Sequence, residues 1–99
     1  MNEKDVFVRK TPNYRIWVDE VGTGRIRVLK RINFKILMIL FEEIHGEIKK
    51  RTTDNPGKVR ITFYISKSLY NEMSANAKEF LEFCQFCMGV QFELVLTEI

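Results

Sequence analysis

The sequence predicts an α/β (α+β) domain, a two-layer sandwich in which a mixed sheet of four or five strands carries two helices on one face. Two observations predict it. The strand-like segments alternate between an apolar and a polar side, and two longer segments repeat apolar residues at helical spacing. The expected order is β-β-β-α-β-α-β. The 99 residues are enough for a single domain, 1–99, with one core.

Five strands are expected, over residues 6–9, 14–20, 25–30, 58–65 and 90–98. Pro12 and Asn13 favour a turn after the first strand. Val21-Gly22-Thr23-Gly24 favours a hairpin bend, because both glycines can adopt positive φ. Alternation predicts that one side of these strands faces the core, with Ile16, Val18, Ile26, Val28, Val59, Ile61, Phe63, Ile65, Phe92, Leu94 and Leu96 on it.

Two helices are expected between the later strands. Asn33 is suited to cap a helix over residues 33–51, because its side-chain oxygen can accept a bond from an early backbone N–H. Ser66 or Ser68 is suited to cap a second helix that reaches about Met88, and Gly89 follows as a C′ residue. Apolar residues recur at helical spacing along the second segment, at Leu69, Met73, Ala77, Phe80, Leu81, Cys84, Cys87 and Met88.

The polar side of the strands carries arginines and aromatic residues, and it is the candidate binding surface. Trp, Tyr and Arg are enriched at the energetic centres of protein interfaces, which favours a protein partner. Aromatic rings also stack on unpaired bases and arginines contact phosphates, so single-stranded nucleic acid is the alternative partner. A purely structural explanation is that Trp17 covers a sheet edge while arginines pair with Asp19 and Glu93. The candidate partner-binding residues are Arg15, Trp17, Arg25, Arg27, Arg60 and Tyr64.

The positive charge is concentrated in the first part of the chain. The formal net charge is +3, with 14 Lys/Arg against 8 Asp/Glu in residues 1–60 and 2 against 5 in residues 61–99. Clustered cations attract polyanions, although lysines and arginines also keep small proteins soluble. The charge is therefore compatible with an anionic partner without requiring one.

The second helix offers a further candidate interface. Phe80, Phe83 and Phe86 cannot share one narrow stripe with the other apolar residues of that helix, so some apolar surface is expected outside the core. Phe83 and Phe86 are the candidate interface residues, for a protein partner or for a homodimer. Burial of a broad helix face by a curved sheet and the C-terminus is the competing explanation.

The remaining reactive residues predict neither catalysis nor a cofactor. Cys84 and Cys87 lie near the C-terminal end of the expected helix, where the helix dipole disfavours a thiolate, so we expect packed thiols. His45 is the only histidine, and no second pair of ligands completes a zinc site. We expect no catalytic residues, no metal and no cofactor.

Residues 1–5 are charged and the longest apolar run, residues 36–41, is too short to span a bilayer. We therefore expect no signal peptide, no membrane and a cytoplasmic location. The sequence as a whole predicts a non-catalytic protein-binding or regulatory domain that acts through the sheet face or the second helix, with self-association as one form of partner.

The order of hairpin, helix, strand, second helix and final strand, over residues 14–98, is similar to that of STAS-type regulatory domains. In that family a serine after a central strand can be a phosphorylation switch, and Ser66 and Ser68 occupy the comparable junction in Ile65-Ser66-Lys67-Ser68-Leu69. The chain has no Asp-Ser-x-Gly type of motif. An RNase H-like arrangement shares the element order, but its sheet is covered on both faces and its carboxylate cluster has no counterpart here.

Overall fold

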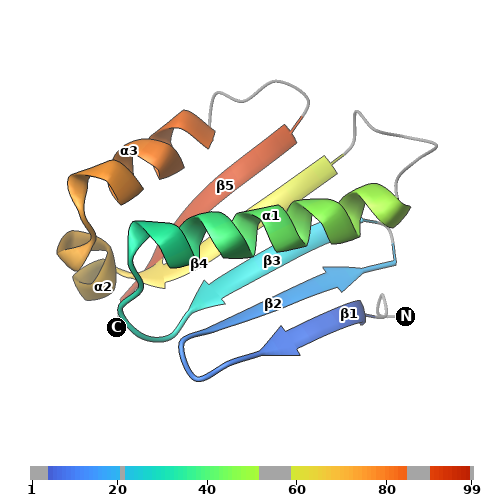
Figure 1. The fold of residues 1–99 in the computed structure, drawn as a ribbon, viewed down its shortest axis with the longest axis horizontal. Helices are drawn as coiled ribbons and strands as arrows, with labels where there is room; N and C mark the ends of the chain where they lie inside the picture. Colours follow the sequence, from blue (N-terminus) through green and yellow to red (C-terminus); the bar gives the residue numbers. More distant parts are fainter. Residues whose placement is uncertain (1–4, 21, 52–58, 85–89, 99) are drawn as a thin grey trace.

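A computed structural model describes residues 5–20, 22–51, 59–84 and 90–98. In this part of the chain the fold is α+β, with one five-stranded mixed sheet and three helices (Figure 1). The predicted mixed sheet is confirmed. The strands are β1 (Asp5–Lys10), β2 (Tyr14–Asp19), β3 (Thr23–Val28), β4 (Val59–Ser66) and β5 (Val90–Thr97), and the helices are α1 (Phe34–Arg51), α2 (Lys67–Glu72) and α3 (Ala75–Cys84).

The five strands lie side by side in chain order, β1-β2-β3-β4-β5. The pairs β1–β2 and β2–β3 are antiparallel, whereas β3–β4 and β4–β5 are parallel. Each parallel pair needs a crossover, which α1 supplies between β3 and β4, and α2 with α3 between β4 and β5. The helices lie on one face of the sheet (Figure 1).

One core joins the covered face of the sheet to the helices. Phe41 of α1 stacks on Phe63 of β4, with 5.7 Å between ring centroids, and meets Phe80 of α3 edge to face at 5.1 Å. Leu96 was expected in the core but is 40% exposed, because β5 is an edge strand with no neighbour beyond it. The side chain of Val59 lies outside the described residues. The other strand residues expected in the core are buried (Ile16, Val18, Ile26, Val28, Ile61, Phe63, Ile65) or partly buried (Phe92, Leu94).

Gly24 lies where α1 packs closely on the sheet. A Cβ atom at Gly24 would be 2.7 Å from Cδ1 of Ile48 and 2.8 Å from Cδ1 of Ile44. The prediction that both glycines of this segment form the bend was wrong, because only Gly22 has a positive φ, of 89°, and Thr23 already belongs to β3. Gly24 is thus a strand residue whose missing side chain lets the helix approach.

The helix caps explain both a confirmed and a wrong prediction. Asn33 caps α1 as predicted, since its Oδ1 accepts a bond from the backbone N–H of Ile36 at 2.8 Å. The second helix was predicted as one segment to about Met88 and is instead broken at Met73, whose backbone is extended. Ser74 begins the new helix by accepting a bond from the N–H of Ala77 at 3.2 Å. Residues 85–89 lie outside the described chain.

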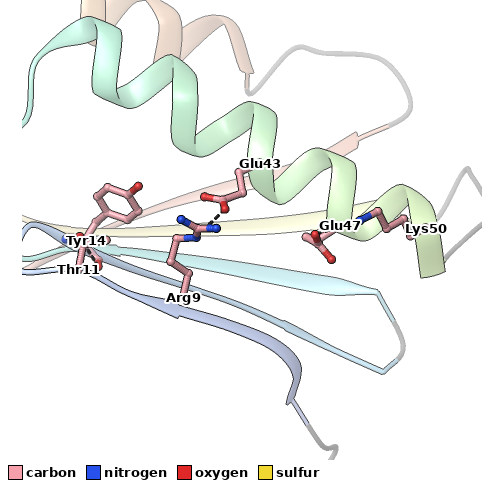
Figure 2. A network of polar contacts seen from close by, with 6 residues as sticks. All are labelled: Arg9, Thr11, Tyr14, Glu43, Glu47 and Lys50. Carbon is pink, nitrogen blue, oxygen red and sulfur yellow. Dashed lines mark hydrogen bonds and ion pairs between the residues drawn. The ribbon is translucent and has the colours of Figure 1, made fainter.

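The edge strand β1 is tied to α1 by an ion pair on the covered face. Nε of Arg9 lies 2.6 Å from Oε2 of Glu43, and Figure 2 shows the two side chains reaching toward each other between strand and helix. The same view shows Thr11 beside Tyr14, where the threonine hydroxyl donates to the carbonyl of Tyr14 at 3.0 Å. Because side chains alternate along a strand, Val8 and Lys10 point to the opposite face.

Candidate interaction surface on the open sheet face

The face of the sheet opposite the helices, called the open face below, carries all six predicted partner-binding residues. Cross-strand register arranges its side chains in rows. One row contains Val8, Trp17, Arg25, Thr62 and Glu93, and the adjacent row contains Lys10, Arg15, Arg27, Tyr64 and Val95. Arg60 lies opposite Gln91 at the other end of β4.

Two contacts between neighbouring strands hold part of this face in place. The guanidinium carbon of Arg27 lies 4.9 Å from the ring centroid of Tyr64, a cation–π distance. Nε of Arg60 donates to Oε1 of Gln91 at 3.1 Å. The first contact joins β3 to β4 and the second joins β4 to β5, so the predicted residues of β4 do lie beside the hairpin.

Arg25 is the one predicted arginine with an acidic partner among the described residues. Its Nη1 lies 3.4 Å from Oδ2 of Asp19, a carboxylate that is only 1% exposed. The other carboxylate oxygen, Oδ1, accepts a bond from the backbone N–H of Thr23 at 3.0 Å. Asp19 therefore fixes the β2–β3 connection as well as neutralising Arg25. The pairing of an arginine with Glu93 that the sequence suggested is not formed in the described part of the chain.

A hollow of about 180 Å³ opens on the antiparallel half of the open face. Its walls are Trp17, which is half-buried, and three cationic side chains, with Val8 beside them. The described ion pairs engage none of these three cations, which are Lys10, Arg15 and Arg27. Sequence alternation indicated the arginines, whereas Lys10 was missed because only the pairing of β1 with β2 places it opposite Arg15.

The second predicted interface is described only in part. Phe83 on α3 is 64% exposed, whereas Phe86 lies outside the described residues. Beside Phe83, an apolar hollow of about 240 Å³ lies between α1 and α3 over β4 and β5. Met38 lines this hollow and was not among the predicted interface residues, although its place on the apolar face of the first helix was the available signal. The remaining lining residues are Phe41, Glu42, His45, Ile61, Phe80, Cys84 and Phe92.

Two residues with reactive side chains, His45 and Cys84, line the apolar hollow between α1 and α3. His45 is exposed on α1 and Cys84 is half-buried at the end of α3, while Cys87 lies outside the described residues. Within the described ranges, no three His, Cys, Asp or Glu side chains are close enough to hold a metal ion. No helix in the described part of the chain has both the length and the hydropathy to cross a bilayer.

The two serines at the end of β4 differ in their environment. Ser66 is buried and caps α2, its Oγ accepting a bond from the backbone N–H of Leu69 at 3.2 Å. Ser68 is exposed, and its Oγ lies 3.3 Å from that of Ser66. Both line a hollow of about 360 Å³ at the carboxyl ends of the parallel strands, together with Thr97.

In comparisons with known proteins, no family, no curated protein and no solved structure matches this chain. The similarity to STAS-type domains consequently rests on the order of elements alone.

Proposed function

We propose that this chain is a non-catalytic binding domain that recognises a protein partner through its open face. The observation that carries the proposal is the arrangement of side chains in rows on that face, in which Trp17, Tyr64 and arginines lie on one sheet. In the described part of the chain the helices lie on the other face of this sheet (Figure 1). These three residue types dominate binding energy at protein interfaces. Side chains fixed on strands also lose little conformational entropy when a partner binds.

The distribution of charge supports a protein partner over a polyanion. In the two rows the cations lie on β1, β2 and β3, while β5 contributes Glu93 and Val95 to the same rows. Arg60 on β4 is a further cation of the open face, outside these rows. A surface that combines aromatic, cationic, acidic and apolar positions is typical of protein interfaces, which have an apolar centre and a polar rim. We expect the partner to present acidic residues toward Arg15 and apolar residues toward Trp17.

Photo-crosslinking from defined positions tests this proposal. A photoreactive residue would replace either Val8 on the open face or Ile39 on α1, which are matched because they are 50% and 46% exposed. In cells we expect the Val8 position, but not the Ile39 position, to capture one defined protein. The charge reversal Arg15→Glu should abolish that capture. Capture from Ile39 alone, or capture that Arg15→Glu leaves unchanged, would contradict the proposal.

Single-stranded nucleic acid is the second candidate partner, and the hollow beside Trp17 favours it. An indole beside three cations that have no acidic partner among the described residues can stack on a base while the cations contact phosphates. With three phosphate contacts, the logarithm of affinity should fall with the logarithm of salt concentration at a slope of about −2. Trp17 is the only tryptophan, so its fluorescence reports binding directly. No fluorescence change with a mixed oligonucleotide at low salt would exclude this candidate.

A further inference from the structure

A row of like charges crosses the antiparallel half of the open face. Lys10 lies directly opposite Arg15, and Arg15 lies directly opposite Arg27, on three neighbouring strands. Like charges at directly opposite positions destabilise a sheet, because their side chains are neighbours on the same face. The folded chain therefore carries an electrostatic cost at this row.

The other two cations of β1, β2 and β3 have acidic partners, unlike the three cations of the row. Arg9 on β1 pairs with Glu43 of α1, and Arg25 on β3 pairs with Asp19 of β2. For Lys10, Arg15 and Arg27, the described residues supply no acidic partner, and Arg27 is held over the ring of Tyr64 instead. The three positive charges are thus left for a ligand or solvent to balance.

The shape of the surface at this row suits a bound group. The three cations, with Val8 and Trp17, line an open hollow of about 180 Å³. A buried cavity of roughly 150 Å³ admits a benzene molecule, so this volume is sufficient for a phosphate group. Ammonium and guanidinium groups bind phosphate oxygens through short, charge-assisted hydrogen bonds, and the planar guanidinium does so through two at once.

We infer that the hollow formed by Lys10, Arg15, Arg27 and Trp17 binds a phosphate group, and that the bound anion stabilises the sheet. A dianion balances most of the charge of the row and offers acceptors to all three cations. Trp17 forms the wall against which a ring attached to the phosphate would pack. The inference uses the same open face as the proposed function but does not need a protein partner, because free phosphate suffices to test it.

Thermal unfolding of the purified chain tests the inference, with phosphate compared against chloride at equal ionic strength. A phosphate concentration of ten times Kd raises the ratio of folded to unfolded protein about elevenfold. In a domain of this size the midpoint then rises by several degrees. Arg15→Gln should reduce this rise to the part caused by salting-out, whereas Lys35→Gln, which neutralises an exposed cation on α1, should keep the full rise. The general salting-out effect of phosphate is common to all three proteins.

The melting midpoint in the absence of phosphate distinguishes a row of mutually repelling cations from a surface whose cations do not interact. Without phosphate and at low salt, Arg15→Gln should have a higher melting midpoint than the wild type, because it relieves the repulsion along the row. Lys35→Gln should not raise the melting midpoint under these conditions. An Arg15→Gln variant that is less stable than the wild type, or that keeps the full response to phosphate, would overturn the inference.

The source of the phosphate is distinguished by titrating Trp17 fluorescence with inorganic phosphate, a nucleoside monophosphate and a single-stranded oligonucleotide. Equal affinities would support a site for the phosphate group alone, and tighter binding of the nucleotide would support packing of its ring on Trp17. If the chain binds none of the three ligands but still crosslinks to a protein from the Val8 position, the phosphate site is refuted and the proposed protein-binding function is not affected.

Discussion

Adding one methyl group at Gly24 should destabilise the protein, because α1 passes over this position. The new Cβ would lie 2.7 Å from Cδ1 of Ile48 and 2.8 Å from Cδ1 of Ile44. Carbon atoms in good contact are about 3.5–4.0 Å apart, so the ends of the two isoleucine side chains, the methyl group or the helix must move by close to 1 Å. Both isoleucines are fully buried, so any such movement takes place within the packed core.

The expected magnitude follows from two opposing effects. Overpacking a dense core typically costs about 1–3 kcal/mol. Replacing glycine by alanine also lowers the conformational entropy of the unfolded chain, which stabilises the folded protein by about 0.4–1 kcal/mol. We therefore expect Gly24→Ala to lower the free energy of unfolding by about 1–2 kcal/mol, which lowers the melting midpoint by roughly 4–16 °C in a domain of this size. Circular dichroism during heating and urea titration measures both quantities.

Gly46→Ala is the matched control for this prediction. Gly46 lies inside α1, and a Cβ there would meet nothing within 4 Å. Alanine in a helix interior is favoured over glycine by about 0.8–1.0 kcal/mol, so this variant should be more stable than the wild type. A loss of stability in Gly24→Ala together with a gain of stability in Gly46→Ala would support the placement of α1 across β3. A neutral or stabilising Gly24→Ala would refute the close packing of helix and strand.

Three further predictions concern the caps and surfaces. Ser66→Ala should cost about 1 kcal/mol of stability because it removes the cap of α2, whereas Ser68→Ala should change little; equal effects of the two in urea titration would contradict the capping role. Asp19→Ala should cost about 1–3 kcal/mol, since a buried carboxylate and its bond to the backbone are lost, and the exposed neighbour Glu20 provides the control substitution. Phe83→Glu should leave the melting midpoint unchanged, because Phe83 is 64% exposed; in light scattering it should shift any dimer toward monomer, and a strict monomer in the wild type at high concentration would remove self-association through α3.

The two faces of the sheet were predictable because alternation is a local property. Once Ile16 and Ile26 are assigned to the core, the period of two places Trp17 and Arg27 on the other side. The order of the strands is not local, and the contact of Arg27 with Tyr64 depends on β4 lying next to β3. The hollow beside Trp17 likewise required the pairing of β1 with β2, which brings Lys10 to Arg15.

The broken second helix shows where helical spacing is misleading. Leu69, Met73, Ala77 and Leu81 keep one period across the break, so spacing alone predicts a continuous helix. The break follows from a competing local interaction, because the hydroxyl of Ser74 caps the following turn while the backbone of Met73 is extended. Serine in a helix interior commonly signals such competition. Phe86 and Cys87 of the predicted helix lie outside the described residues.

Quenching of the fluorescence of Trp17 tests the central claim most directly, namely that the open face is uncovered and positively charged. Trp17 is the only tryptophan, and Arg15 and Arg27 line the same hollow. Iodide should therefore quench its emission more strongly than caesium at equal ionic strength, and Arg15→Gln should narrow that difference. Emission that neither ion quenches, or that caesium quenches more strongly, would contradict the account.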